Sequence, residues 1–199
     1  LGIAGGWQDQ YAAVFGGFNF LEFDAKENVV NPMRIRSETL LELEESLVLV
    51  DTGIAHHSGD IHKDQKQSMT SDSIKKNVKE NVALTYDIRN YLLRGHLEKF
   101  GRALDRAWQL KRTFSQMITN EHIDQIYNGA LENGALGGKL LGAGGGGFFI
   151  FYVGAFEKHN LIRYLKSNGL SVQPFRFEPD GLQSWTSRVN NTNKLFKDK

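Results

Sequence analysis

The sequence predicts a mixed protein in which β-strands and α-helices occupy different stretches of the chain. Three observations support this prediction. Residues 47–50 form a continuous apolar run, as in a strand that is buried on both faces. From Ile74 onwards, apolar residues recur at helical spacing. Residues 137–153 place glycines between two apolar flanks, which indicates a strand, a loop and a second strand.

The first 55 residues are expected to hold short strands around one helix. The helix is predicted near residues 10–14, after a glycine pair. The aromatic segment 18–23 follows another glycine pair and favours β structure. Residues 56–73 are polar and are predicted to form a loop that links a first module, 1–55, to a second, 74–189.

The helical stretch contains three predicted helices. The first has an apolar residue at every fourth position from Ile74 to Tyr86 and ends at Gly95. The third begins after Asn120, a residue type that favours the N-cap. A further helix over 155–168 precedes a last strand over 170–177, and the tail 190–199 is polar. The second helix carries an apolar stripe made of Leu97, Phe100, Leu104, Ala107, Phe114 and Met117.

The composition argues against several classes of function. Lys plus Arg is 24 and Asp plus Glu is 23, so the net charge of +1 gives no argument for a nucleic-acid partner. Cysteine is absent, which excludes disulfides and thiolate chemistry and fits a cytoplasmic location. No apolar run approaches the ~20 residues that span a bilayer, so no membrane partner is expected.

The strongest local feature is the run of glycines at residues 142–147, which Ala143 alone interrupts. Glycine lets a backbone approach a ligand closely, and successive exposed N–H groups can bind an anion. The alternative is a plain hairpin turn with no ligand. A turn needs only one or two glycines, and the larger number here costs folding entropy. Both interpretations stay open on this segment alone.

A second feature is the segment GGWQDQ, residues 5–10, where a carboxylate lies between two amides. A kinase that acts on a hydroxyl needs a carboxylate to orient the hydroxyl or to accept its proton. Asp9 is the candidate for this role. The alternative, which this segment taken alone favours, is that Asp9 caps a helix over residues 10–14.

A third feature is the segment 51–58, which follows the buried strand at a position where ligand contacts often lie. Thr52 belongs to it. Three histidines, His56, His57 and His62, lie in or near this segment. Their spacing matches no helical or finger-like metal site, so solvated loop histidines are the preferred interpretation and no metal site is predicted.

Two of these segments together resemble the GHMP kinases, named for galacto-, homoserine, mevalonate and phosphomevalonate kinase. Residues 138–151, GKLLGAGGGGFFIF, are similar to the third motif of the family. Residues 5–17, GGWQDQYAAVFGG, are similar to the region that carries its catalytic aspartate in sugar kinases. The longer run 5–23 is most similar to the subfamily of D-glycero-D-manno-heptose 7-phosphate kinases, and GGWQDQ is also close to bacterial fucokinases. The resemblance covers nearly all of the chain up to the tail.

The resemblance implies an α+β fold of two domains with the active site in the cleft between them. Residues 1–55 would be the end of the first domain and would carry the catalytic aspartate. Residues 74–189 would form a second, helical and ferredoxin-like domain.

The resemblance also implies an ATP- and Mg²⁺-dependent kinase that phosphorylates a sugar phosphate, here at the anomeric hydroxyl of a heptose 7-phosphate. Asp9 would orient or deprotonate that hydroxyl. The residues that would contact the substrate or the phosphates are Gly5, Gly6, Gln8, Thr52, Gly142, Ala143, Gly144, Gly145 and Gly146.

One departure from the family is marked. The family binds the triphosphate with a loop of the type Pro-x-x-x-Gly-Leu-Gly-Ser-Ser-Ala, and no segment of this chain matches it. That loop and the usual Mg²⁺-binding Ser and Glu lie upstream of the catalytic aspartate in the family. The 199-residue chain alone is therefore expected to be inactive, and to need a missing N-terminal half or a second copy of itself.

The strands of residues 1–55 are then expected to expose Phe18, Phe20 and Phe23. Two alternatives to a heptose kinase remain. One is another sugar kinase of the superfamily, such as a fucokinase, and the other is a non-catalytic remnant or binding module.

Overall fold

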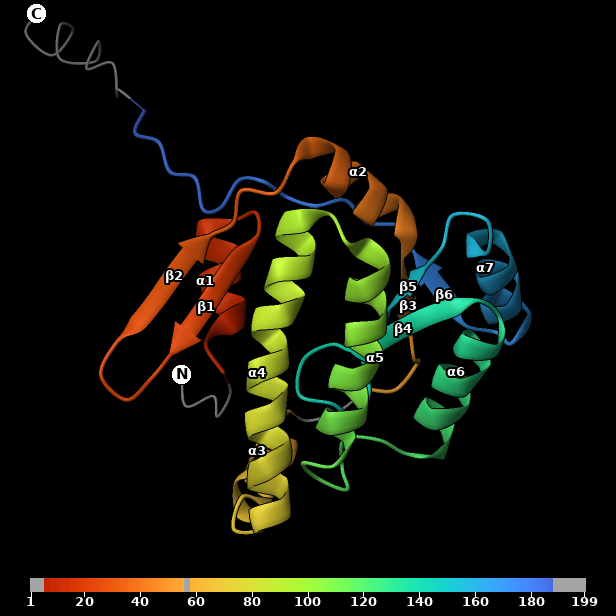
Figure 1. Cartoon of the computed structure of the whole chain (residues 1–199), viewed down its shortest axis with the longest axis horizontal. Helices are drawn as coiled ribbons and strands as arrows, with labels where there is room; N and C mark the ends of the chain where they lie inside the picture. The colour runs from red at the N-terminus through yellow and green to blue at the C-terminus, as the bar shows by residue number, and fades with distance from the viewer. Residues whose placement is uncertain (1–5, 56–57, 188–199) are drawn as a thin grey trace, which may run out of the picture.

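The computed structural model describes residues 6–55 and 58–187 as a mixed α+β structure, in agreement with the predicted fold class. A small β-hairpin with one helix lies beside a larger sheet that helices flank (Figure 1). The elements in chain order are α1 (Gln8–Phe15), β1 (Asn19–Phe23), β2 (Asn28–Pro32), α2 (Ser37–Ser46), β3 (Leu47–Asp51), α3 (Ser58–Ser68), α4 (Asp72–Arg94), α5 (Leu97–Arg112), α6 (Glu121–Glu132), β4 (Ala135–Leu140), β5 (Phe148–Val153), α7 (Lys158–Ser167) and β6 (Ser171–Gln173).

The larger sheet has four antiparallel strands in the spatial order β4, β5, β3, β6. Counted along the chain this order is second, third, first, fourth, with α6 before the second strand and α7 before the fourth. The pattern is that of a ferredoxin-like unit, which confirms the predicted architecture. The sheet includes β3, which lies on the N-terminal side of the boundary predicted at residue 55. The limits of the two domains stay a prediction.

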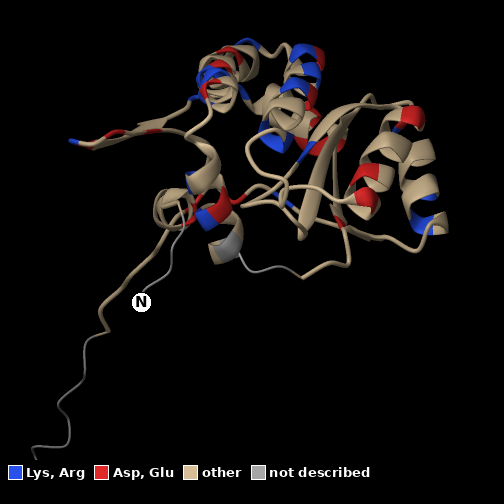
Figure 2. Cartoon of the chain, turned by 90° about the horizontal axis from the view of Figure 1, so that it is seen from below, with Lys and Arg blue, Asp and Glu red and all other residues tan. Residues whose placement is uncertain are grey.

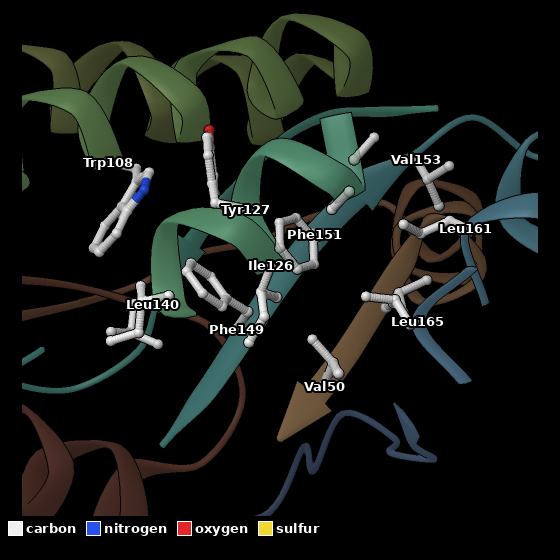
Figure 3. Close-up of a cluster of buried hydrophobic side chains, with 14 of the residues drawn as sticks. Val50, Trp108, Ile126, Tyr127, Leu140, Phe149, Phe151, Val153, Leu161 and Leu165 are labelled. Atoms are coloured by element: carbon white, nitrogen blue, oxygen red, sulfur yellow. The ribbon is translucent and has the colours of Figure 1, made fainter. Parts of the chain in front are cut away.

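One face of this sheet carries the main hydrophobic core (Figure 3). Phe149 and Phe151 of β5 stack with their ring centroids 5.0 Å apart, and Trp108 of α5 lies edge-on to Phe149 at 5.5 Å. Aromatic pairs of this kind add about 0.5–1.5 kcal/mol beyond the burial of their area. Helices α6 and α7 complete this core. Its fully buried large side chains are Val50, Trp108, Ile118, Ile123, Tyr127, Leu140, Phe149, Phe151, Val153, Leu161 and Leu165.

Helices α2, α4 and α5 provide the second core, which packs on side chains of the opposite face of the sheet. Leu43 of α2 and Leu92 of α4 meet Leu47 and Tyr152 there. Alternate residues of β3 therefore enter the two cores, with Val50 fully buried on one side and Leu47 5% exposed on the other. This confirms the prediction that the apolar run 47–50 is buried on both faces.

Helix α4 buries Phe20 of the hairpin β1–β2. Phe20 is only 7% exposed, because the Tyr86 ring lies 5.0 Å from its ring and the Arg89 guanidinium lies 4.7 Å from its centroid. Phe23, in contrast, is 43% exposed. The expectation that the three phenylalanines are exposed is therefore wrong for Phe20, which an aromatic and cation–π contact from a distant helix buries. It is also wrong in part for Phe18, which is half-buried against the second core.

The strongest local signals predict the helix ends correctly. Gly95 ends α4 in the left-handed conformation, with a φ of 70°. Asn120 caps α6, since its Oδ1 accepts the N–H of Ile123 at 3.0 Å. Helix α5 is shorter than predicted, because the chain turns at Thr113 and leaves Phe114 and Met117 outside it. The last strand is also shorter than predicted.

Two helices differ from the sequence prediction. Helix α3 occupies residues 58–68, where the sequence predicts a polar loop. Its one fully buried apolar anchor is Ile61, so apolar periodicity gives no signal, and its Asp64 accepts a hydrogen bond from Ser115 instead. Helix α2 is not predicted at all. It is rich in glutamate, and Leu43 is its only deeply buried large apolar side chain.

The segment that follows β6, residues 174–182, crosses α2 and returns to the hairpin (Figure 1). The N–H of Phe177 donates to Glu44 Oε2 at 3.0 Å, and its ring lies 4.8 Å from the Phe18 ring. The N–H of Leu182 donates to the carbonyl oxygen of Val14 in α1 at 3.0 Å. This C-terminal segment therefore ties α1 and the hairpin to the larger sheet.

Basic and acidic residues are interspersed along the helices (Figure 2). Among the described residues no helix is both long and apolar enough to cross a bilayer.

Candidate functional site

The glycine run forms a loop between β4 and β5, which we call the glycine loop (residues 141–147). The N–H of Leu141 donates to the Phe148 carbonyl oxygen at 2.8 Å and closes the β4–β5 hairpin. The N–H of Gly145 donates to Ile118 at 2.8 Å, and that of Gly147 donates to Ile54 at 3.0 Å. Two neighbouring segments of the chain thus hold the C-terminal half of the loop in place.

Thr52, a predicted site residue, lies beside this loop. Its N–H and its Oγ1 each donate to the carbonyl oxygen of Gly147 at 2.8 Å, and the residue is 2% exposed. His122 Nε2 lies 3.1 Å from the Thr52 carbonyl oxygen. The fold therefore places the predicted segment 51–58 against the glycine loop, which Thr52 supports.

The glycine loop presents backbone N–H groups that have no partner within the chain. Over the ranges 6–55 and 58–187, no residue accepts a hydrogen bond from the N–H of Ala143, Gly144 or Gly146. All three residues are buried. A buried N–H without an acceptor costs about 1–3 kcal/mol, so these groups suit a bound water or an anion. Closely spaced N–H groups of this kind form the anion-binding arrangement called a nest.

Packing also explains part of the glycine content. Gly144 has a φ of 119°, and a Cβ there would lie 3.0 Å from the Ile118 Cα. A Cβ on Gly146 would collide with the Ile54 carbonyl oxygen. Glycine is thus needed to seat the loop against Ile118 and Ile54. The glycine count alone does not separate a ligand loop from a plain turn, whereas the unpaired N–H groups favour a ligand.

A buried lysine supports the N-terminal half of the loop. Lys111, near the end of α5, is 9% exposed, and its Nζ donates to the carbonyl oxygens of Gly142 at 2.5 Å and Leu140 at 3.2 Å. Burial, together with the charge of Lys139, lowers the pKa of Lys111 to about 7. Burial also lowers the pKa of Lys139. Within the described part of the chain, neither lysine forms an ion pair.

The sequence prediction missed Lys111, although a signal for it exists. The apolar stripe of α5 runs through Leu97, Phe100, Leu104 and Ala107, and the next position on that stripe is Lys111. A lysine is almost never fully buried without a partner. Its place on a buried stripe therefore marks it as a residue with a specific contact to make.

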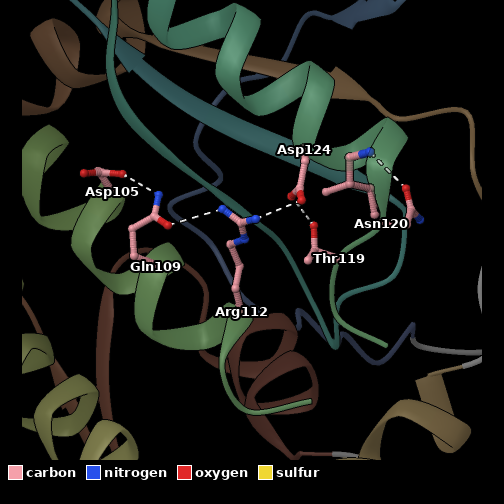
Figure 4. A network of polar contacts seen from close by, with 7 residues as sticks. Asp105, Gln109, Arg112, Thr119, Asn120 and Asp124 are labelled. Atoms are coloured by element: carbon pink, nitrogen blue, oxygen red, sulfur yellow. Dashed lines mark hydrogen bonds and ion pairs between the residues drawn. The ribbon is translucent and has the colours of Figure 1, made fainter. Parts of the chain in front are cut away.

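A polar network fixes the end of α5 against α6 (Figure 4). Arg112 Nη2 lies 2.8 Å from Asp124 Oδ2, and its Nη1 lies 3.3 Å from Gln109 Oε1. Thr119 donates to the other oxygen of Asp124. Lys111 and Ile118, which support the glycine loop, immediately precede Arg112 and Thr119 of this network. The network therefore helps to fix the backbone at both residues.

The stability of the protein is expected to depend on pH through Lys111. An unfolded lysine has a pKa near 10.4, whereas that of Lys111 is lowered to about 7. Between these values the unfolded chain binds more protons, so the free energy of unfolding rises with pH by up to about 1.4 kcal/mol per pH unit. This contribution is fully present above about pH 10.4 and is lost as the pH falls through about 7.

Denaturant unfolding of wild type and Lys111→Met between about pH 7 and about pH 10 measures this contribution. We expect the difference in unfolding free energy to grow in favour of wild type as the pH rises. A difference that stays constant over the range would contradict the buried lysine.

Asp9 lies in the first turn of α1 and its side chain is exposed. Trp7, not Asp9, occupies the N-cap position, and no side chain caps the helix. The alternative that Asp9 serves as a helix cap is therefore wrong. Gln8 is exposed beside it, while Gly5 lies outside the described residues. Among the described residues no hydrogen bond or ion pair links Asp9 to the glycine loop.

Comparison with known proteins identifies the family. The family model described as GHMP kinases C terminal matches residues 88–169, a span that contains Lys111 and the whole glycine loop. The D-glycero-alpha-D-manno-heptose 7-phosphate kinase of Campylobacter jejuni is 39% identical to this chain over 189 residues. The chain belongs to the GHMP kinase superfamily. The match covers 93% of this GHMP kinase chain and 55% of that relative.

Solved structures agree with this assignment. A D-glycero-D-manno-heptose 1-phosphate kinase from Bacteroides thetaiotaomicron superposes with a TM-score of 0.68 at 30% identity, over 94% of this chain and 51% of that one. The mevalonate kinase of L. major, solved with R-mevalonate, gives a TM-score of 0.72 at 20% identity, over 87% and 53%. The second likeness shows the fold alone. The GHMP kinase chain described here spans about half the length of these relatives.

Proposed function

We propose that this chain is the part of an ATP-dependent sugar-phosphate kinase that carries the acceptor carboxylate and the glycine loop. The proposed reaction is transfer of the γ-phosphoryl group of ATP to the anomeric hydroxyl of D-glycero-D-manno-heptose 7-phosphate. The observation that supports this substrate is the 39% identity to a heptose 7-phosphate kinase over 93% of the chain. A cytoplasmic enzyme is consistent with the absence of cysteine.

In this proposal Asp9 orients the acceptor hydroxyl or takes its proton, because phosphoryl transfer depends on positioning the nucleophile in line with the phosphate. Its exposed position on α1 leaves the carboxylate free to meet a substrate. The N–H groups of Ala143, Gly144 and Gly146 bind phosphate oxygens, and Thr52 holds the loop. Gly6 and Gln8, which are near Asp9 in sequence, contact the substrate in this proposal.

The described residues fit the phosphates of ATP better than they fit its metal. Three unpaired N–H groups supply donors for phosphate, while Lys111 supports the loop through its carbonyl oxygens. Over the described ranges no cluster of three His, Asp or Glu side chains could hold Mg²⁺. Mg²⁺ neutralises developing charge on phosphates in such enzymes. We assign no residue of this chain to it.

Steady-state assays with a panel of acceptors test the proposal. Protein produced from the full coding sequence and the 199-residue chain are each given ATP with heptose 7-phosphate, heptose 1-phosphate or L-fucose. We expect the full product to show its highest kcat/KM with heptose 7-phosphate. We expect the 199-residue chain alone to be inactive, since no loop of the family's triphosphate-binding type is found in it.

Each other outcome identifies a different function. A preference for L-fucose would assign the chain to a fucokinase, and a preference for heptose 1-phosphate would move the acceptor to another hydroxyl. No transfer to any sugar by the full product, with the fold intact, would favour a non-catalytic binding module.

A further inference from the structure

Two consecutive peptide units of the glycine loop are held from their carbonyl side by side chains of two different helices. Lys111 Nζ, on α5, donates to the Gly142 carbonyl oxygen at 2.5 Å. Gln65 Nε2, on α3, donates to the Ala143 carbonyl oxygen at 3.3 Å. Both side chains reach the loop from helices that are far from it in sequence.

The geometry of the peptide bond turns these contacts into a constraint on the next N–H. A peptide unit is planar and trans, so its C=O and its N–H point in opposite directions. The Gly142 carbonyl and the Ala143 N–H belong to one unit, and the Ala143 carbonyl and the Gly144 N–H to the next. Holding the two carbonyls therefore aims the N–H of Ala143 away from Lys111 and that of Gly144 away from Gln65.

These are two of the N–H groups that have no acceptor among the described residues. Glycine-rich segments are free to flip a peptide unit at little steric cost, so an unheld loop would spread its N–H groups over many directions. An N–H group loses less entropy on ligand binding when a hydrogen bond to the carbonyl of the same peptide unit already fixes its direction.

Lys111 and Gln65 are themselves fixed by contacts of their helices. Lys111 is 9% exposed and lies one residue before Arg112, whose ion pair with Asp124 is 2.8 Å long. Gln65 is partly buried and follows Asp64, which accepts a hydrogen bond from the buried Ser115. Helix α3 is further fixed by Ile61, which is 3% exposed.

We propose that Lys111 and Gln65 are positioning residues, which hold the N–H groups of Ala143 and Gly144 toward a phosphate of the bound ligand. This inference rests on the proposed function for the identity of the ligand. It goes beyond that function in assigning the orientation of the loop to two side chains outside it. Neither side chain touches the phosphate in this arrangement.

The test uses protein from the full coding sequence with two test substitutions, two matched controls and one rescue variant, Lys111→Arg. Lys111→Met and Gln65→Leu remove the donors and keep the size of the side chains. Lys99→Met and Gln67→Leu are the matched controls, because they are exposed positions of the same helices. Binding of ATP and of inorganic tripolyphosphate is measured by calorimetry, and the backbone amide resonances of Ala143 and Gly144 are followed by NMR.

We expect Lys111→Met and Gln65→Leu each to weaken tripolyphosphate binding about tenfold, as for one lost hydrogen-bond constraint. The ligand-induced shifts of the Ala143 and Gly144 amides should shrink in both variants. Lys111→Arg, which keeps a donor, should recover part of the affinity, and the two controls should bind as wild type does.

Wild-type affinity in folded Lys111→Met and Gln65→Leu would overturn the inference. A loss confined to melting temperature, with normal amide shifts on ligand addition, would also overturn it, since a merely structural role predicts that pattern. If Lys111→Met does not fold, Gln65→Leu decides alone. Tripolyphosphate that shifts the two amides in a protein with no kinase activity would support the inference and refute the proposed function.

Discussion

Asp9→Asn is expected to lower kcat by about 10²–10⁴-fold in protein from the full coding sequence, with little change in the KM for ATP. A carboxylate that orients the acceptor or takes its proton acts mainly in the transition state, so its loss appears in kcat. The substitution should leave stability almost unchanged, because Asp9 is exposed and caps no helix. Steady-state kinetics with heptose 7-phosphate and a thermal melt measure both quantities.

Asp87→Asn is the matched control for this prediction, since Asp87 is an exposed aspartate on α4. Its kcat should stay within about twofold of wild type, as expected for a surface site. If Asp9→Asn behaves like Asp87→Asn, the carboxylate has no part in the reaction and another base must be sought.

Gly144→Val is expected to lower kcat/KM by about 10²-fold among folded molecules. Its φ of 119° strains any side chain, and the new Cβ would lie 3.0 Å from Ile118 Cα, so the loop must shift. A misplacement of about 1 Å can cost that factor when positioning carries the catalysis. The measurement pairs kcat/KM with the fraction folded, taken from a melting curve.

Gly169→Val is the control for backbone strain alone. Gly169 follows α7, has a φ of 76°, and has open space around its Cβ position. Its substitution should reduce stability and leave the activity of the folded fraction intact. If Gly144→Val also loses activity only in step with its folded fraction, the glycine loop is a plain turn.

Much of the fold could be predicted because its signals are local. A glycine in the left-handed conformation at Gly95 and an asparagine cap at Asn120 each act through their own backbone, so sequence alone reveals them. Helix α3 could not be predicted in this way. Its contacts include Ile61 in the core, a hydrogen bond that Asp64 accepts from Ser115 and one that Gln65 donates to Ala143, all of which follow only from the tertiary fold.

The candidate site divides in the same manner. The glycine run and Thr52 were identifiable by residue type and by position after a strand, and the fold places them in contact. Lys111 required knowledge that its helix stripe is buried and that a loop carbonyl lies opposite. The ferredoxin-like architecture was expected only from the family resemblance, because strand pairing between β3 and β5 joins residues that are far apart in the chain.

The position of Asp9 depends on a contact that the sequence does not reveal. The C-terminal segment 174–182 binds the end of α1 through Leu182 and Val14, and it binds Gly17 through the carbonyl of Glu178 at 2.8 Å. The helix that carries Asp9 is therefore held by residues from the other end of the chain.

A crystal structure of the full coding-sequence product, with heptose 7-phosphate and a non-hydrolysable ATP analogue, tests the central claim most directly. We predict that a phosphate oxygen lies about 2.7–3.2 Å from the N–H nitrogens of Ala143 and Gly144, and that an Asp9 oxygen lies about 2.6–3.2 Å from the sugar hydroxyl. Phosphates bound away from the glycine loop, or a sugar out of reach of Asp9, would contradict the claim that these two features form one phosphoryl-transfer site.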